Sequence, residues 1–243
     1  MKLLRALHAF YIFIWFVLLF TLFFLLLLIP IVFKKAHHLT GVFNRWWAHV
    51  FFSLTFFRRQ IIVHNEIDKN AQYIFCPNHF SYLDIPTMGL NPVNSIFVGK
   101  NDMEKIPLFG FMYKNLHITV DRESMKSRYT TILRSAKAID EGKSLMIFPE
   151  GGIVSKNMPK MHRFKDGAFR VAIEKQIPIV PVTIPYIRII LPDETLMTRQ
   201  IKLKVDLTRP INTIGMTLED VDKLKQQTYN TIDAELKRHT NEN

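Results

Sequence analysis

The chain carries a histidine and a carboxylate in a short segment that follows an apolar run. Residues 76–86 read CPNHFSYLDIP, and Pro86 is tolerated only in the first turn of a helix, so a helix should begin close to Asp84. His79 then lies in the loop before that helix. A histidine there can remove a proton from a hydroxyl, and a carboxylate on its other nitrogen fixes the tautomer and stabilises the imidazolium. The pair therefore predicts general-base chemistry.

The same residues also permit a structural interpretation. Ser81 and Asp84 have the spacing of a capping box, in which case His79 is only a loop histidine. No serine or cysteine stands out as a nucleophile, because nothing near Cys76 would lower the pKa of its thiol. If the His/Asp pair is catalytic, the attacking oxygen can therefore belong to the substrate.

Two other polar groups follow apolar strand candidates. Asp121 and Arg122 end one such run, and Glu150 with Gly151 ends another. Ligands of open α/β sheets bind outside the carboxyl ends of the strands, where a guanidinium can make two parallel hydrogen bonds to a phosphate or carboxylate. A surface Asp–Arg pair and a plain Pro-Glu-Gly-Gly turn are the structural alternatives. Three strand ends that deliver a His/Asp pair, an arginine and a glutamate to one domain favour a shared site.

Several kinds of chemistry find no support in the sequence. It contains neither a P-loop pattern nor a GxGxxG run, so nucleotide chemistry is not predicted. His37 and His38 have no paired Cys or His at ligand spacing, so no metal site is predicted either. A single cysteine cannot form an internal disulfide.

These groups need a scaffold of strands and helices to bring them together. After residue 60, β-rich runs alternate with helical patterns, which predicts an α/β domain. The expected strands are residues 61–64, 72–76, 95–99, 116–120, 144–148, 178–184 and 201–206. The expected helices are residues 84–90, 125–140, 167–176 and 217–239, the last of which opens with a capping-box pattern at Thr217 and Asp220.

The first 58 residues differ in composition from the rest of the chain, because they contain long apolar runs and no acidic residue. Residues 9–33 carry no charge, and a helix of that length reaches roughly 37 Å, enough to cross a bilayer. A second apolar stretch at residues 41–57 holds an arginine, a histidine and two tryptophans, which is typical of an interfacial segment. One spanning helix and a monotopic two-helix hairpin both fit, and a cleavable signal peptide is the weaker alternative. We predict membrane-anchoring helices at 1–58 and a catalytic α/β domain at 59–243.

Positive charge is concentrated at the N-terminal end. The chain has 32 Lys and Arg against 21 Asp and Glu, a net charge of +11, and Glu66 is the first acidic residue. Basic residues that flank long apolar runs attract an anionic membrane surface, whereas nucleic-acid binding needs them spread over a folded face. We therefore predict membrane lipids and no nucleic acid as partners. The excess of Lys and Arg after the apolar run predicts a cytoplasmic domain.

Four short motifs resemble those of the lysophosphatidic acid acyltransferase family, the 1-acylglycerol-3-phosphate acyltransferases within the glycerolipid acyltransferase group. In family order they are NH-x4-D at residues 78–84, VDR at 120–122, FPEG at 148–151 and VPV at 180–182. A K-x3-E-x2-P-x2-G segment at residues 100–110 is similar to the one between the first two motifs. The resemblance runs from about residue 60 to residue 185 and implies a mixed, mostly parallel sheet of about seven strands flanked by helices, with N-terminal membrane helices.

The resemblance implies transfer of an acyl group from acyl-CoA or acyl-carrier protein to the free hydroxyl of a lysophospholipid, 1-acylglycerol-3-phosphate, which gives phosphatidic acid. In that reaction His79 would be the general base and Asp84 would orient it, without a covalent acyl-enzyme. The acyl donor is a co-substrate, and no other cofactor is implied. The implied location is a bacterial inner membrane with the catalytic domain in the cytoplasm.

The resemblance also implies residues that bind substrate. Arg122 would bind the acceptor phosphate, Glu150 would bind an acceptor hydroxyl or support that grip, and Gly151 would let the backbone approach the ligand closely. Lys100 is a candidate for an anionic group of acceptor or donor. Asn78, beside the catalytic pair, is a further candidate.

The third motif departs from the family pattern. The family continues Gly-Thr-Arg-Ser, whereas this chain reads GGIV at residues 151–154, so the usual second phosphate-binding arginine is absent. The basic residues of the following loop that could replace it are Lys156, Lys160, Arg163 and Lys165. The other interpretation is an acceptor without glycerol phosphate, such as a lyso-ornithine or lyso-glycine lipid.

Two other classes of protein stay open. A non-catalytic lipid-binding or scaffold protein would keep the fold and the anchor but would show no turnover that depends on His79. A serine- or cysteine-type lipid hydrolase would release free fatty acid without an acceptor.

Overall fold

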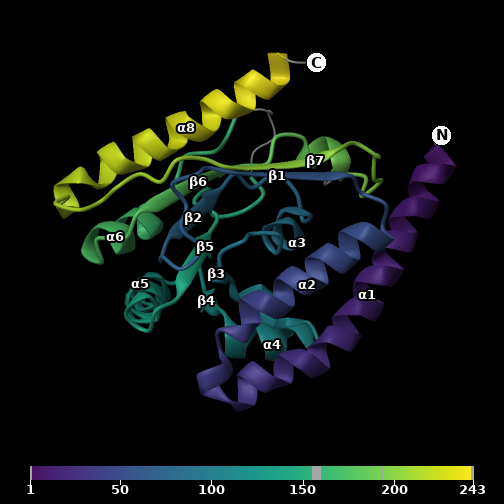
Figure 1. Cartoon of the computed structure of the whole chain (residues 1–243), viewed down its shortest axis with the longest axis horizontal. Helices are drawn as coiled ribbons and strands as arrows, with labels where there is room; N and C mark the ends of the chain where they lie inside the picture. The colour runs from purple at the N-terminus through teal and green to yellow at the C-terminus, as the bar shows by residue number, and fades with distance from the viewer. Residues whose placement is uncertain (1, 155–159, 193, 242–243) are drawn as a thin grey trace.

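A seven-stranded sheet runs through the centre of the computed structural model, which describes residues 2–154, 160–192 and 194–241 (Figure 1). The strand order is β1-β7-β6-β2-β5-β3-β4. The strands are β1 (Arg59–Val63), β2 (Ile74–Pro77), β3 (Ser95–Lys100), β4 (Ile118–Val120), β5 (Ser144–Ile147), β6 (Ile179–Thr183) and β7 (Leu203–Leu207). Every strand expected from the sequence overlaps one of these. The predicted α/β class with a mixed, mostly parallel sheet is confirmed.

The direction of the strands decides where the loops meet. The five strands from β6 to β4 are parallel to one another, whereas β7 is antiparallel to β6 and parallel to β1. The central strands β2 and β6 are buried along their whole length, as expected for a parallel sheet covered on both faces. The segments that follow β2, β3, β4 and β5 therefore leave the sheet at the same edge.

Helices cover both faces of the sheet (Figure 1). One face carries α5 (Met125–Asp140), α6 (Gly167–Glu174) and α8 (Val221–Asn241), and the other carries α2 (Leu39–Leu54) and α4 (Phe109–Leu116), with α1 (Lys2–Val32) outside them. Two short helices, α3 (Asp84–Met88) and α7 (Ile187–Ile190), follow β2 and β6. The helices predicted after residue 60 are all present, and the capping box at Thr217 and Asp220 forms as predicted. The sequence did not predict α4 or α7.

The N-terminal helices form an antiparallel hairpin that lies against the sheet domain. Within α1, the side chains of Ile12 and Leu19 are buried in the same core as strand β2, and Phe51 and Phe52 of α2 are fully buried there. The hydroxyl of Tyr11 donates to the carbonyl of Leu54 at 2.9 Å, which fixes α1 to the end of α2. Helix α1 is also long and apolar enough to cross a membrane, and within the described residues no other helix is. The boundary between residues 58 and 59 stays a prediction.

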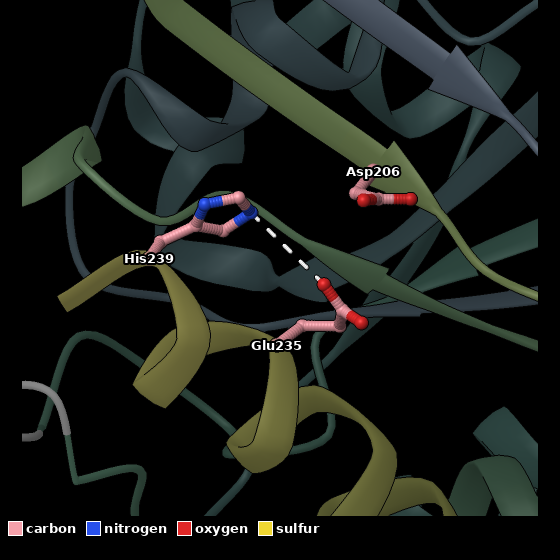
Figure 2. A group of neighbouring side chains, drawn as sticks. All are labelled: Asp206, Glu235 and His239. Atoms are coloured by element: carbon pink, nitrogen blue, oxygen red, sulfur yellow. Dashed lines mark ion pairs between the residues drawn. The ribbon is translucent and has the colours of Figure 1, made fainter. Parts of the chain in front are cut away.

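An ion-pair network fastens helix α8 to strand β7. Figure 2 shows Asp206 of β7 facing Glu235 and His239 of α8, with His239 Nε2 4.0 Å from Glu235 Oε2. The Arg238 guanidinium lies 2.8 Å from a Glu235 carboxylate oxygen and 3.8 Å from one of Asp206. Lys204 Nζ lies 3.4 Å from His239 Nδ1. Asp206, Glu235 and His239 are residue types that can bind a metal ion. The side chains of Arg238 and Lys204 already place positive charge beside them.

Candidate active site

The loop after β2 brings the predicted His/Asp pair into contact. Nδ1 of His79 lies 2.9 Å from Oδ2 of Asp84, the first residue of α3. Pro86 occupies the first turn of this helix, where its missing N–H costs nothing. Because an ionised carboxylate can only accept, Nδ1 carries the hydrogen in this contact and Nε2 keeps its lone pair. This is the tautomer that a general base needs.

Asp84 also holds the backbone of the loop. Its Oδ2 accepts the N–H groups of Phe80 at 2.7 Å and Ser81 at 2.9 Å, so the capping role and the contact with His79 coexist. The side chain is fully buried. Burial raises the pKa of Asp84, and the three N–H donors oppose that rise because they favour the charged form. The carboxylate therefore orients the ring and the loop together.

The ring of His79 is held from a second side by an aromatic side chain. It stacks on Phe148, which follows β5, with 4.1 Å between the ring centroids. His79 is 8% exposed, so only a small part of the ring faces solvent. Apart from the presence of Phe148 in the third motif, nothing in the sequence predicts this contact. Stacking and the bond to Asp84 together leave the imidazole little freedom to rotate.

Glu150 connects the loops after β2 and β5. Its Oε1 accepts the backbone N–H of His79 at 2.7 Å, and its Oε2 accepts the backbone N–H of His162 at 2.8 Å. The side chain is 1% exposed, and burial raises the pKa of Glu150 to about 7 despite these two donors. Both oxygens are therefore engaged by the protein, which fits a positioning role better than direct contact with an acceptor hydroxyl.

Arg122 lies against the glycine turn that follows Glu150. Its Nη1 donates to the carbonyl of Gly151, which has φ +80°. Gly152 has φ +156°, and a Cβ at that position would lie 3.3 Å from the same nitrogen. Burial lowers the pKa of Arg122, and among the described residues no carboxylate lies within 4.0 Å of its guanidinium. Within the described residues this positive charge lies beside the turn without an ion-pair partner, and the charge of Asp102 acts on it only from beyond 4.0 Å.

The other candidates occupy less suitable positions. Lys100, at the end of β3, forms an ion pair with Asp102, which compensates its charge. The amide of Asn78 is used by the backbone of Ile184, with Oδ1 accepting its N–H at 2.7 Å and Nδ2 donating to its carbonyl at 3.2 Å. Cys76 is fully buried, and burial raises the pKa of its thiol well above the usual range, so a thiolate nucleophile is disfavoured.

The contacts connect the three predicted strand ends into one cluster. His79 after β2 bonds to Glu150 after β5, and Arg122 after β4 bonds to the neighbouring Gly151. This is the arrangement expected where parallel strands end at one edge of a sheet. Of the loop cations named from the sequence, Lys156 lies outside the described residues.

Proteins with similar sequences include known acyltransferases. The sequence model of the acyltransferase family matches residues 60–185, more than half of the chain. The chain is 27% identical over 184 residues to an uncharacterized acyltransferase of Schizosaccharomyces pombe, which covers 74% of this chain and 66% of that protein. It is 29% identical over 157 residues to a 1-acyl-sn-glycerol-3-phosphate acyltransferase of Limnanthes alba, covering 63% of this chain and 54% of that protein. For the enzyme of the same name from Haemophilus influenzae the identity is 30% over 148 residues, covering 58% and 59%.

The fold also has a close counterpart among solved structures. The crystal structure of the 1-acyl-sn-glycerophosphate (LPA) acyltransferase PlsC from Thermotoga maritima superposes with a TM-score of 0.79, covering 97% of this chain and 98% of that one at 18% identity. The chain spans about half to two thirds of the length of the curated relatives named above. The family match covers the residues over which the four motifs resemble the acyltransferases. This chain belongs to the acyltransferase family.

Proposed function

We propose that this protein transfers an acyl chain from a thioester, acyl-CoA or acyl-carrier protein, to the free hydroxyl of 1-acylglycerol-3-phosphate. The observation that carries the proposal is the 2.9 Å contact between His79 Nδ1 and Asp84 Oδ2, in a cluster with an unpaired arginine. The names of the curated relatives, which include 1-acyl-sn-glycerol-3-phosphate acyltransferases, support the choice of acceptor.

The proposed mechanism is direct attack by the acceptor. Nε2 of His79 removes the proton from the acceptor hydroxyl as its oxygen attacks the thioester carbonyl carbon, and the carbonyl oxygen takes the negative charge. When the tetrahedral intermediate collapses, the C–S bond breaks and the leaving thiolate takes the proton back from the imidazolium. Asp84 stabilises the imidazolium between these two steps. The high pKa and full burial of Cys76 are consistent with a reaction that needs no thiol nucleophile.

We further propose that the protein lies on a membrane through its N-terminal hairpin. The outward face of α1 exposes large apolar side chains, among them Phe13, Leu18 and Leu25, and α4 adds Phe111. Since α1 packs along α2 and α4 instead of leaving the domain, the arrangement favours a monotopic hairpin over a single spanning helix. The proposed location is the cytoplasmic face of a bacterial inner membrane, which agrees with the basic residues Lys34 and Lys35 after α1.

An acceptor panel tests the proposed function. Purified protein in nanodiscs with acyl-CoA is assayed for thiol release and for acylated product with lysophosphatidic acid, lysophosphatidylcholine, a lyso-aminolipid or no acceptor. Selective acylation of lysophosphatidic acid is the expected result. Fatty acid release without acceptor would instead indicate a hydrolase, absence of turnover with every acceptor and with acyl-carrier protein as donor would indicate a binding protein, and selective use of the lyso-aminolipid would refute the proposed acceptor.

A further inference from the structure

Two cationic side chains lie against the glycine turn after β5. Nη1 of Arg122 donates to the carbonyl of Gly151. The stem of Lys165 is also close, with its Cγ and Cε 3.5 and 3.7 Å from the position that a Cβ on Gly151 would take. These distances place the lysine stem directly against the turn.

The backbone around Lys165 is fixed by contacts with the same turn. Its N–H donates to the carbonyl of Pro149 at 2.8 Å, and the preceding Phe164 is buried in the core. The side chain itself is exposed, and within the part of the chain that the structure describes its ammonium makes no ion pair within 4.0 Å. Because the backbone of Lys165 is fixed and its side chain is exposed, its ammonium is suited to bind an anion from solvent.

The other described cations of this loop, Lys160 and Arg163, lie next to helix α8. Lys160 and Arg163 line a hollow against helix α8 together with Lys225 and Tyr229. The pKa of Asp222 on that helix is lowered mainly by its hydrogen bond to Lys225 and also by the charge of Arg163. Among the described loop cations, Lys165 is therefore the one that packs on the glycine turn.

We propose that Lys165 is the second cation of the acceptor site and that it binds, together with Arg122, the phosphomonoester of the acceptor. This inference rests on the proposed function and narrows it to an acceptor with a terminal phosphate. A phosphomonoester carries a charge of about −1.5 to −2 at pH 7, so it gains more from two neighbouring cations than the single carboxylate of a lyso-glycine or lyso-ornithine lipid does. Lys165 would then supply the charge that the family places in the arginine of the third motif, where this chain has Ile153.

Equilibrium binding without thioester tests this role independently of turnover. Binding of lysophosphatidic acid and of monoacylglycerol, which lacks the phosphate, is measured by native mass spectrometry of the full chain in nanodiscs. The wild type is expected to prefer the phosphate lipid, and K165A should weaken its binding roughly tenfold while leaving monoacylglycerol unaffected. K165R should restore most of the affinity, and R163A, on the α8 side, should bind like the wild type.

Kinetics with the same variants distinguish an acceptor phosphate from the phosphates of CoA. K165A should raise the acceptor KM roughly tenfold with little change in kcat or in the KM for acyl-CoA. A rise in the acyl-CoA KM alone, unchanged lysophosphatidic acid binding in K165A, or an equal loss in R163A would each overturn the inference. If K165A weakens phosphate-lipid binding but the wild type acylates no lysophosphatidic acid, the proposed reaction fails while the assignment of Lys165 stands.

Discussion

At the scale of single residues, the site is built from contacts that serve position and chemistry together. Asp84 accepts two backbone N–H groups and the Nδ1–H of His79, so the residue that shapes the loop also fixes the tautomer of His79. Glu150 also holds His79 in place, because its Oε1 accepts the backbone N–H of His79. The sequence could predict the His/Asp pair because its members lie only five positions apart. It could not predict the partners of Glu150, because His79 lies 71 positions away and the contact is to its backbone.

Arg122 is expected to act on the acceptor more than on the thioester. Substituting it with alanine removes a cation beside the glycine turn, so the acceptor KM should rise roughly 10- to 100-fold, since hydrogen bonds between charged groups contribute about 1.5–3 kcal/mol. The KM for acyl-CoA should change little. Steady-state kinetics check this, with Arg128→Ala on the exposed face of α5 as control. Equal effects on both substrates would remove Arg122 from the acceptor site.

Glu150→Gln is expected to destabilise the fold as well as the site. A glutamine presents one oxygen and one NH2 group, so either the His79 or the His162 N–H loses its acceptor. A buried donor left unsatisfied costs about 1–3 kcal/mol, which urea denaturation would detect as a lower free energy of unfolding. Glu174→Gln, at an exposed position of α6, should change that free energy by less than about 0.5 kcal/mol. A stability of Glu150→Gln equal to that of the control would contradict the positioning role.

The raised pKa of Glu150 predicts a pH dependence of stability. Between the ordinary pKa of 4.5 and the folded value of about 7, the folded protein binds more protons at this group than the unfolded chain does. The contribution of Glu150 to stability is therefore largest below pH 4.5 and falls as the pH rises toward 7. Free energies of unfolding measured across this window should fall with pH more steeply in the wild type than in Glu150→Gln. Parallel curves would show that Glu150 titrates normally.

At the scale of elements, local pattern predicted the strands and most helices but not their arrangement. Each strand was visible as a short β-rich run, whereas the reversed direction of β7 and β1 depends on pairing between distant segments. The local sequence does not predict helix α4, because its eight residues include Gly110 and two phenylalanines, which are weak helix formers. The helix also follows Leu108, which has φ +60°. Tertiary packing against α1 offsets that weak local preference.

The outward face of α1 is expected to hold the protein on a bilayer. Leu18 and Leu25 are 55% and 64% exposed, so replacing both with glutamine should leave the core intact and reduce liposome co-sedimentation at least tenfold. The matched control is the pair Ile214 and Leu218, 75% and 56% exposed near the start of α8, also replaced by glutamine. Equal loss in both variants, or none in the α1 variant, would contradict this membrane face.

At the scale of the whole molecule, the apolar hairpin packs against the sheet domain that carries the candidate site. Helix α4, which follows the strand carrying Lys100, packs on α1 through Phe109 and Phe20, whose ring centroids are 5.5 Å apart. The strand after α4 ends just before Arg122. If α1 faces the membrane as proposed, a site joined to it in this way suits an acceptor and a product that both reside in the bilayer. The net charge of +11, concentrated before Glu66, would add attraction to an anionic surface.

The most direct test of this account is the rate of acyl transfer to lysophosphatidic acid by His79→Ala beside the wild type, at saturating acyl-CoA. Since His79 is proposed to remove the acceptor proton, the variant should lose about 10²- to 10⁴-fold in kcat. Its circular dichroism spectrum and its binding of lysophosphatidic acid should match those of the wild type. Turnover by a folded His79→Ala protein close to the wild-type rate would contradict the proposed mechanism.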